Sequence, residues 1–348
     1  MNTTWVFNFF TTLSQSVIPP NVFALLIVIP SATLYITELG VIFRFKKTFK
    51  SSFFKLFAAR TISSILGLIG HCLYIRIGRV GLFLSIYIKL PVVYLVVINF
   101  IAIHFNYVEG TSTVILLLNR LTALLWPLKY EKIWNKLWYW AIILAYLLPL
   151  TLSWHIWFSE IVIWVHDNQT FSLYTQIKPD DPNDPLIASL FFIFSQLCLL
   201  INLACLFIYK RTKIASSEQT ESRQKMEMRL TIYSLWTFFS QLLYAFYMII
   251  LYISSSQLQK FVDPDLAELI FLSIYNQYSW VNDISTIAIP AFLLLWASEI
   301  MRSRIYSLIR IICFLPKNTN NNAIMVIPKQ ERWNFSRQPE GMLSTREK

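Results

Sequence analysis

Seven long apolar stretches dominate this sequence and limit the folds that are open to it. About 20 apolar residues in a helix are long enough to cross the ~30 Å hydrocarbon core of a bilayer. Backbone polar groups find no water in that core, so only helices and closed barrels can span it. We therefore predict an all-α membrane protein with seven transmembrane helices. They cover approximately residues 20–43, 55–77, 91–119, 137–158, 186–209, 230–253 and 267–296.

The composition agrees with a membrane protein and argues against several other classes. Hydrophobic residues make up 56% of the 348 positions and charged residues 14%, a balance that is unusual for a soluble domain. The four cysteines lack the spacing of a metal site or a disulfide framework. The sequence also lacks HExxH, paired CxxC, phosphate-loop and nucleophile-elbow motifs. We predict no metal, no cofactor and no enzymatic activity.

The distribution of positive charge predicts an orientation. Most of the 30 lysines and arginines fall in three of the connecting loops and the C-terminal tail, which alternate with the remaining loops. Positive residues mark the cytoplasmic side, so the N-terminus is predicted outside and the tail inside. The few on the other side are Arg76, Arg79, Lys89, Lys178 and Lys260, and Arg60 lies within the second stretch. The formal charge of +11 then indicates attraction to the anionic inner leaflet, about 1 kcal/mol per residue, and argues against nucleic acid.

These assignments divide the chain into three parts. Residues 1–19 form an extracellular N-terminus, residues 20–312 the seven-transmembrane domain, and residues 313–348 a polar, disordered cytoplasmic tail. The basic and apolar residues of 299–314 predict a short amphipathic eighth helix on the membrane surface. Three candidate modification sites follow from short patterns. They are the glycosylation sequons at Asn168 and Asn2, and palmitoylation of Cys313.

The segment Ile115 to Trp134 ends the third apolar stretch with an unusual order of residues. Asn119-Arg120 is followed by one apolar turn, then by Pro127 and the basic aromatic segment around Tyr130. A lone arginine can simply snorkel to the water boundary. Seven-helix receptors end their third helix in this way, with the arginine at the G-protein face. We take Asn119, Arg120, Pro127 and Tyr130 as candidate coupling residues and keep membrane anchoring as the alternative.

Polar residues within the third and seventh stretches are candidates for a binding site. In the third, Asn99, Asn106 and Glu109 fall on one helical stripe. Glu109 lies 11 residues before Arg120, about 16 Å of helix rise, so it should face the bundle near mid-membrane. Tyr275, Asn276 and Gln277 add to the outer half of the seventh stretch. The alternative for these residues is a hydrogen-bond network between helices, and for Asp283 the two readings are equally open.

Glu38 and Arg60 are expected near the inner ends of their helices. They would snorkel there, or pair with each other or with loop charges.

The segment HFNYVEGTSTVILLLNRLTALLWPLKYEKIW (His104 to Trp134) resembles the third-helix signature of the nematode serpentine receptor class gamma family. That resemblance implies a seven-transmembrane bundle of the G-protein-coupled type, a chemosensory role, an unknown small-molecule ligand and a heterotrimeric G protein as partner. The sequence departs from the broader rhodopsin-like pattern, because the residue before Arg120 is Asn119 and the second outer loop has no cysteine. These departures put the rhodopsin-type activation lock in doubt.

Two other membrane classes compete with a receptor. A transporter should show inverted repeats and helices broken by glycine or proline, and no such repeat is visible. A ligand-gated channel subunit built from seven helices is the other alternative. Orientation separates it from a receptor, because channel-type odorant receptors place the N-terminus inside.

Overall fold

A computed structural model describes residues 3–126, 129–165, 170–175, 193, 196–205, 207–208 and 221–312. The first half of the chain forms α1 (Thr3–Gln15), α2 (Ile18–Arg44), α3 (Ser52–His71), η1 (Cys72–Arg76), α4 (Ile77–Val80), α5 (Leu84–Tyr87), α6 (Val92–Leu125), α7 (Tyr130–Leu147), α8 (Leu150–Ser153) and η2 (Trp154–Phe158). The second half forms β1 (Ile161–Val165), β2 (Phe171–Thr175), α10 (Glu221–Tyr252), η3 (Ile253–Gln257), η4 (Leu258–Lys260), α11 (Pro264–Tyr275), α12 (Tyr278–Asp283), η5 (Ile284–Ala288), α13 (Ile289–Ala297) and α14 (Glu299–Ile312).

Among these described residues, 6 helical segments are long and apolar enough to cross a membrane. They cover 18–44, 52–80, 92–125, 130–158, 235–260 and 264–297, close to six of the seven predicted spans. The described part of the fifth predicted span contains a shorter apolar helix, Gln196–Cys205. The prediction of a helical membrane protein is therefore confirmed. The helix predicted for residues 299–314 is also present, as α14.

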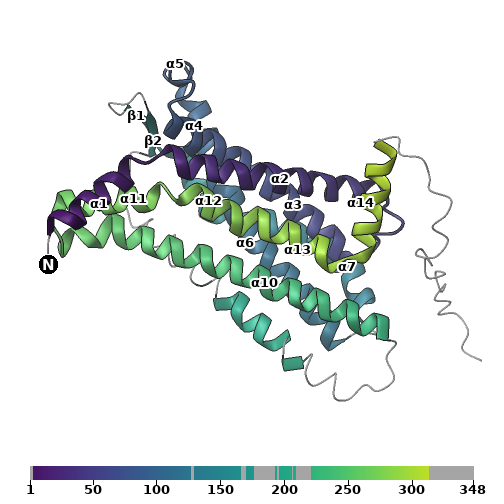
Figure 1. The fold of residues 1–348 in the computed structure, drawn as a ribbon. Coiled ribbons are helices and arrows are strands. Elements are labelled where there is room, and N and C mark those ends of the chain that lie inside the picture. Colours follow the sequence, from purple (N-terminus) through teal and green to yellow (C-terminus); the bar gives the residue numbers. More distant parts are fainter. Residues whose placement is uncertain are drawn as a thin grey trace, which may run out of the picture. The chain divides into compact units, whose positions relative to one another are not determined.

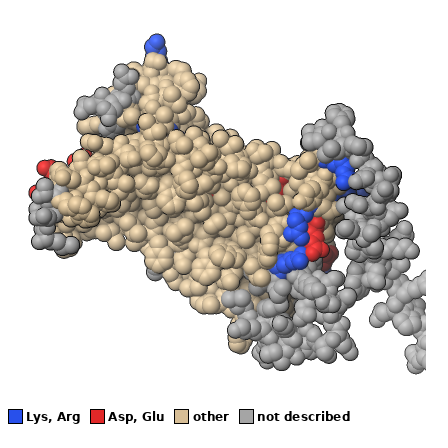
Figure 2. Space-filling view, viewed as in Figure 1, with Lys and Arg blue, Asp and Glu red and all other residues tan. Residues whose placement is uncertain are grey.

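The long helices lie side by side as a bundle (Figure 1), and α3 packs closely against α6. Gly70 makes this approach possible, because a Cβ there would lie only 2.6 Å from the backbone nitrogen of Ala102 on α6. Many leucine, isoleucine and phenylalanine side chains remain exposed on the outer faces, Leu26, Leu144 and Phe246 among them. On the face shown in Figure 2, coloured charged residues gather toward the ends and leave the middle nearly free. This is the surface that a surrounding bilayer requires.

The two ends of the bundle differ in what they carry. We call one the hairpin end, where α4, α5, β1 and β2 lie (Figure 1). We call the other the basic end, where the last turns of α6 carry Asn119 and Arg120 and where Arg229 pairs with Glu299. Three π-helical turns, η1, η3 and η5, interrupt the regular helices. Such turns add a residue to the helical repeat and often occur at functional sites.

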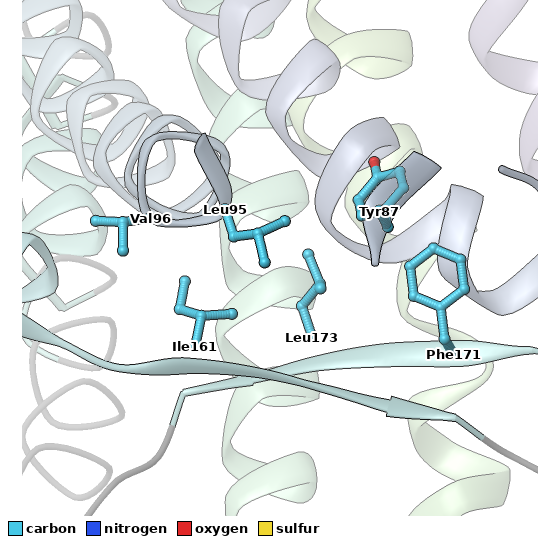
Figure 3. Packing of buried hydrophobic residues seen from close by; sticks show 6 residues of the cluster. All are labelled: Tyr87, Leu95, Val96, Ile161, Phe171 and Leu173. Carbon is cyan, nitrogen blue, oxygen red and sulfur yellow. The ribbon is translucent and has the colours of Figure 1, made fainter. Parts of the chain in front are cut away.

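Strands β1 and β2 form an antiparallel hairpin that the sequence analysis did not predict. Its side chains alternate, and one face packs on the helices through an apolar cluster shown in Figure 3. The cluster consists of Tyr87, Leu95, Val96, Ile161, Phe171 and Leu173. Gly78 on α4 fits directly beneath, since a Cβ there would collide with the carbonyl oxygen of Phe171. Apolar packing thus holds the hairpin to the bundle.

The segment assigned only as an N-terminus contains α1, which packs against α11. Ser273 donates a hydrogen bond to the Phe10 carbonyl at 3.1 Å, and Asn276 donates one to the Ser14 carbonyl at 2.8 Å. Helix α11 itself begins with a side-chain cap, because the carboxylate of Asp263 accepts from the Asp265 amide and Pro264 occupies the first turn.

Candidate functional site

Arg60 of α3 and Glu109 of α6 form an ion pair inside the bundle. Nη2 of Arg60 lies 3.0 Å from Oε1 of Glu109, and their side chains are 0% and 5% exposed. Nη1 of Arg60 also points to the Tyr233 hydroxyl of α10 at 3.5 Å. An unpaired charge at membrane depth costs roughly 2.5–3.5 kcal/mol or more, so pairing lowers the cost of burying each group. The pair joins α3 to α6 near the middle of α6.

This arrangement corrects the expectation for Arg60 and Glu38. Arg60 is fully buried and pairs with Glu109, so the expectation that it snorkels or pairs with Glu38 or with loop charges is wrong. Glu38 of α2 is also fully buried, and neither of its carboxylate oxygens has a hydrogen-bond partner among the described residues. The sequence could not show this, because spacing within one helix does not reveal which residues face it from others.

A second buried ion pair lies nearer the hairpin end, between Arg76 of η1 and Asp283 of α12. The same arginine nitrogen, Nη2, also lies 3.5 Å from the Ser279 carbonyl oxygen. Both partners sit at π-helical turns, since Arg76 closes η1 and η5 begins directly after Asp283. Arg76 was counted with the outer-side positive residues at the end of the second predicted span. In the structure it lies within a helical segment and is only 7% exposed.

Several polar atoms of this second pair lack partners. Among the described residues, no hydrogen bond reaches Nε or Nη1 of Arg76, Oδ2 of Asp283 or Oδ1 of Asn282. Buried polar groups are nearly always bonded, so each exception requires an explanation.

Tyrosines from three segments gather beside these groups. Tyr107 of α6, Tyr244 of α10 and Tyr278 of α12 form one buried cluster. Asn106 donates to the Tyr244 hydroxyl at 2.7 Å, and the hydroxyls of Tyr244 and Tyr278 are 3.2 Å apart. Tyr275 stacks on Tyr278 with ring centroids 6.5 Å apart.

Arg79 of α4 extends this aromatic surface with a second positive charge. Its guanidinium lies 4.3 Å from the centre of the Tyr275 ring, within the range of a cation–π interaction. The site therefore combines phenol rings with two arginines one helical turn apart.

At the basic end, Asn119 lies in a closed set of hydrogen bonds. Its amide donates to the Ser52 hydroxyl at 3.1 Å, and it accepts from the Tyr130 hydroxyl at 3.1 Å. The two hydroxyls are themselves 2.8 Å apart. This triangle ties the end of α6 to the starts of α3 and α7.

Arg120, the next residue, is half buried and lies over an aromatic ring. Its guanidinium carbon is 3.7 Å from the centre of the Phe53 ring. A planar guanidinium stacks well on such a ring and keeps its N–H edges available for other contacts.

The family model described as Srg family chemoreceptor matches residues 21–305, most of the chain. This chain belongs to the Srg family. Serpentine receptor class gamma-17 of Caenorhabditis elegans is 30% identical over 122 residues, which cover 34% of this chain and 38% of that protein. Class gamma-16 of the same organism is 27% identical over 145 residues, 40% of this chain and 45% of that protein. The chain thus spans less than half the length of these curated relatives.

Membership of the Srg family, a family of seven-transmembrane receptors, confirms the recognised resemblance and the predicted bundle. It also favours a receptor over the transporter, channel and enzyme alternatives.

The structure brings some predicted ligand residues together and separates others. Asn106 and Tyr275 join the tyrosine cluster through Tyr244 and Tyr278. The amide of Asn99 donates to the Thr175 hydroxyl of the hairpin at 3.2 Å. Glu109 is held by Arg60, and Asn276 by the Ser14 carbonyl. Gln277 accepts from the Trp280 ring nitrogen at 2.8 Å. Their role in ligand binding stays a prediction.

Four predicted residues lie outside the described part of this Srg-family chain, namely Pro127, Asn2, Asn168 and Cys313. The other coupling candidates, Asn119, Arg120 and Tyr130, do meet at the basic end. No group of three or more histidine, cysteine, aspartate and glutamate side chains suited to a metal occurs in the described residues.

The sequence analysis missed Arg76 and Arg79 as site residues. A signal was present, because Arg76 lies in the apolar run Leu73 to Ile77 inside the second predicted span, where an arginine needs a partner. Tyr244 carried no such signal, since its position depends on how α10 packs in the bundle.

Proposed function

We propose that this chain is a chemosensory receptor that binds a small external molecule at the hairpin end and couples to a heterotrimeric G protein at the basic end. The hairpin end and α1 face outward, and the tail beyond residue 312 faces the cytoplasm. Residues 20–312 act as the receptor domain between these ends. Family membership and the one-sided distribution of lysine and arginine support this orientation.

The observation that carries the proposal is the continuity of α6. This single 34-residue helix bears Asn106 beside the tyrosine cluster, Glu109 in the central ion pair and Asn119-Arg120 at the basic end. A rigid helix transmits a shift along its length, so a ligand that displaces Asn106 or its partner Tyr244 also moves Asn119 and Arg120.

At the basic end, the Asn119 triangle restrains α6 in the resting arrangement, and Arg120 lies stacked on Phe53. Displacement of α6 would open this end to a partner helix. Arg120 always carries its charge, and its fork of donors suits the carbonyl oxygens at a partner's helix C-terminus. Pro127 and Tyr130 belong to the same coupling surface in this proposal.

Arg120→Lys separates coupling from membrane anchoring. Lysine keeps the charge and snorkels equally well, but it loses the planar fork. We expect Arg120→Lys to reach the cell surface in near-normal amount while basal and ligand-evoked second-messenger signals fall at least tenfold. The ligand for this assay comes from a screen of small molecules on transfected cells.

Arg304→Lys is the matched control, because Arg304 also lies over a phenylalanine ring, 4.8 Å from the centre of Phe45. It should signal within twofold of the wild type. If Arg120→Lys signals like the wild type at equal surface density, the arginine is an anchor and the coupling assignment is wrong.

The orientation has its own test. Epitope tags at residue 1 and after Lys348 should label intact cells only at the N-terminus. Asn168→Gln and Asn2→Gln should each remove a glycan, whereas Asn334→Gln, at a third sequon in the tail (Asn334-Phe335-Ser336), should not. Labelling of the C-terminal tag on intact cells would overturn the receptor topology.

A further inference from the structure

Arg76 carries more hydrogen-bonding capacity than its surroundings use. Its Nη2 bonds Asp283 and approaches the Ser279 carbonyl, while Nε and Nη1 have no partner among the described residues. The side chain is more than nine-tenths buried, so water does not freely replace these bonds. A guanidinium only donates, and the groups that would complete it are oxygen acceptors. The unbonded nitrogens of Arg76 therefore favour a ligand that carries a hydrogen-bond acceptor.

The charged groups around Arg76 are also unequal in number. Arg76 and Arg79 lie three residues apart in one helical segment, which brings their positions to neighbouring turns. Asp283 pairs with Arg76, whereas Arg79 lies over the Tyr275 ring and has no carboxylate partner within the described part of the chain. Two guanidinium groups thus face one carboxylate, and an added anion would balance them.

The side chains beside the two arginines indicate what the remaining part of a ligand should look like. Tyr275 and Tyr278 stack beside Arg79, and Tyr244 and Tyr247 lie against Tyr278. Such a surface suits an apolar or aromatic body. The unbonded Oδ2 of Asp283 and Oδ1 of Asn282 can accept from a hydroxyl of the same molecule.

We propose that Arg76, assisted by Arg79, binds the carboxylate of a small organic acid whose apolar body packs on the tyrosine cluster. The site deepens the proposed function, since it rests on the chain being a receptor for a small molecule. Strand β2 packs on both η1 and α4, so the hairpin lies beside the two segments that carry Arg76 and Arg79. Both arginines belong to the binding site and neither belongs to the coupling surface.

The test measures direct binding to the purified full-length receptor in lipid nanodiscs. The probes are a panel of straight-chain acids of six to twelve carbons, their 2- and 3-hydroxylated forms and phenyl-substituted propanoic acids. Each acid is paired with its methyl ester and with the amine of equal length. We expect several acids to raise the thermal unfolding midpoint in a dose-dependent manner, and their esters and amines to bind at least tenfold more weakly.

Arg76→Gln should weaken acid binding at least tenfold, and Arg79→Gln at least threefold. Lys89→Gln is the control, because it removes an exposed positive charge near the hairpin end. It should change the affinity for acids less than twofold. Arg76→Lys keeps the charge but loses two donor positions, so it should recover only part of the affinity. If Arg76→Gln does not fold, two measurements still test the proposal: acid binding by Arg79→Gln, and the ratio of the wild-type affinities for each acid and its methyl ester.

The outcomes separate this inference from the proposed function. Acids that bind through Arg76 without any G-protein response uphold the site and count against the signalling role. If no acid in the panel binds, or if acids and esters bind equally, the carboxylate site is overturned. A receptor that signals to neutral molecules alone, with Arg76→Gln unaffected, keeps its proposed function and loses this site.

Discussion

The Arg60–Glu109 and Arg76–Asp283 pairs both bury opposite charges between helices, yet they differ in how completely their surroundings satisfy them. Arg60 bonds a carboxylate and a phenol, is fully buried between α3, α6 and α10, and leaves only Nε without a partner among the described residues. Arg76 shares its one bonded nitrogen between a carboxylate and a backbone carbonyl, and leaves two other nitrogens unbonded. The first pair also lies in regular helix, whereas π-helical turns flank the second.

This difference indicates that the first pair stabilises the fold, whereas the second contributes to ligand binding. A buried charge pair stabilises a fold only when both partners and their remaining polar atoms are well placed. The Arg60–Glu109 pair comes closer to that condition and acts as a brace across the bundle. The Arg76–Asp283 pair retains unbonded atoms within a helical region that is already irregular. Substitutions at the two pairs should therefore change different properties, stability at the first and ligand binding at the second.

The largest expected effect comes from removing one partner of the brace. Arg60→Met should destabilise the receptor by about 3–5 kcal/mol, because Glu109 is left buried without its counter-ion. Most of the protein should then fail to reach the cell surface. The double variant Arg60→Met, Glu109→Gln should regain more than half of the loss, because no uncompensated charge remains. Thermal unfolding in detergent measures both, and a double variant no more stable than the single one contradicts the brace.

Gly70 offers a test of the contact between α3 and α6, which also holds the Arg60–Glu109 pair. Gly70→Ala should cost about 1–3 kcal/mol, because the new Cβ would press on the backbone of Ala102. Gly110→Ala on α6 is the control, since a Cβ there meets nothing within 4 Å. Alanine favours a helix over glycine by about 0.5–1 kcal/mol, so the control should be neutral or stabilised. Equal unfolding midpoints for the two variants would show that α3 and α6 can separate at little cost.

A smaller effect on stability is expected at the second pair. In a double-mutant cycle, Arg76→Met and Asp283→Asn should couple by about 1 kcal/mol, less than Arg60 and Glu109. The reason is that Arg76 contacts Asp283 through a single nitrogen, which it also shares with the Ser279 carbonyl. Unfolding midpoints of the four proteins give the coupling energy. A coupling as large as that of Arg60 and Glu109 would make the second pair a brace as well.

The sequence predicted the parts of this fold that local composition determines. Span lengths followed from runs of apolar residues, and the start of α6 followed from Pro91, which precedes its first residue. The orientation of Glu109 toward the bundle followed from the cost of an exposed charge in lipid. Its partner Arg60 did not follow, because the pairing depends on the register of α3 against α6.

Two other features show where the sequence argument was incomplete. The β-branched and aromatic residues of Ile161–Val165 and Phe171–Thr175 are typical of strands, and this signal was overlooked in favour of the turn-rich residues that follow. The bonds of Asn119 to Ser52 and Tyr130 were not predictable in the same way. They join three helix ends that are far apart in the sequence, and only the packed bundle brings them together.

The smallest expected effect on stability concerns this Asn119 triangle, which lies in the C-terminal part of α6, beyond the tyrosine cluster at the middle of the helix. Tyr130→Phe removes the hydroxyl that bonds both Asn119 and Ser52. Hydrogen bonds between membrane helices contribute about 0.6 kcal/mol each, so the loss should be about 1 kcal/mol.

The same change should raise basal G-protein signalling, because α6 loses a restraint where the proposed partner enters. Tyr139→Phe is the matched control on the same helix, since that side chain is exposed and Tyr130 is not. Second-messenger output at equal surface density measures the difference. The two kinds of contact should therefore respond in opposite directions. Breaking the Arg60–Glu109 pair should lower G-protein signalling, whereas breaking the Asn119 triangle should raise it. Should Tyr130→Phe match Tyr139→Phe in both stability and basal output, the triangle only fills space at the helix ends, and resting control of α6 must come from the central pair.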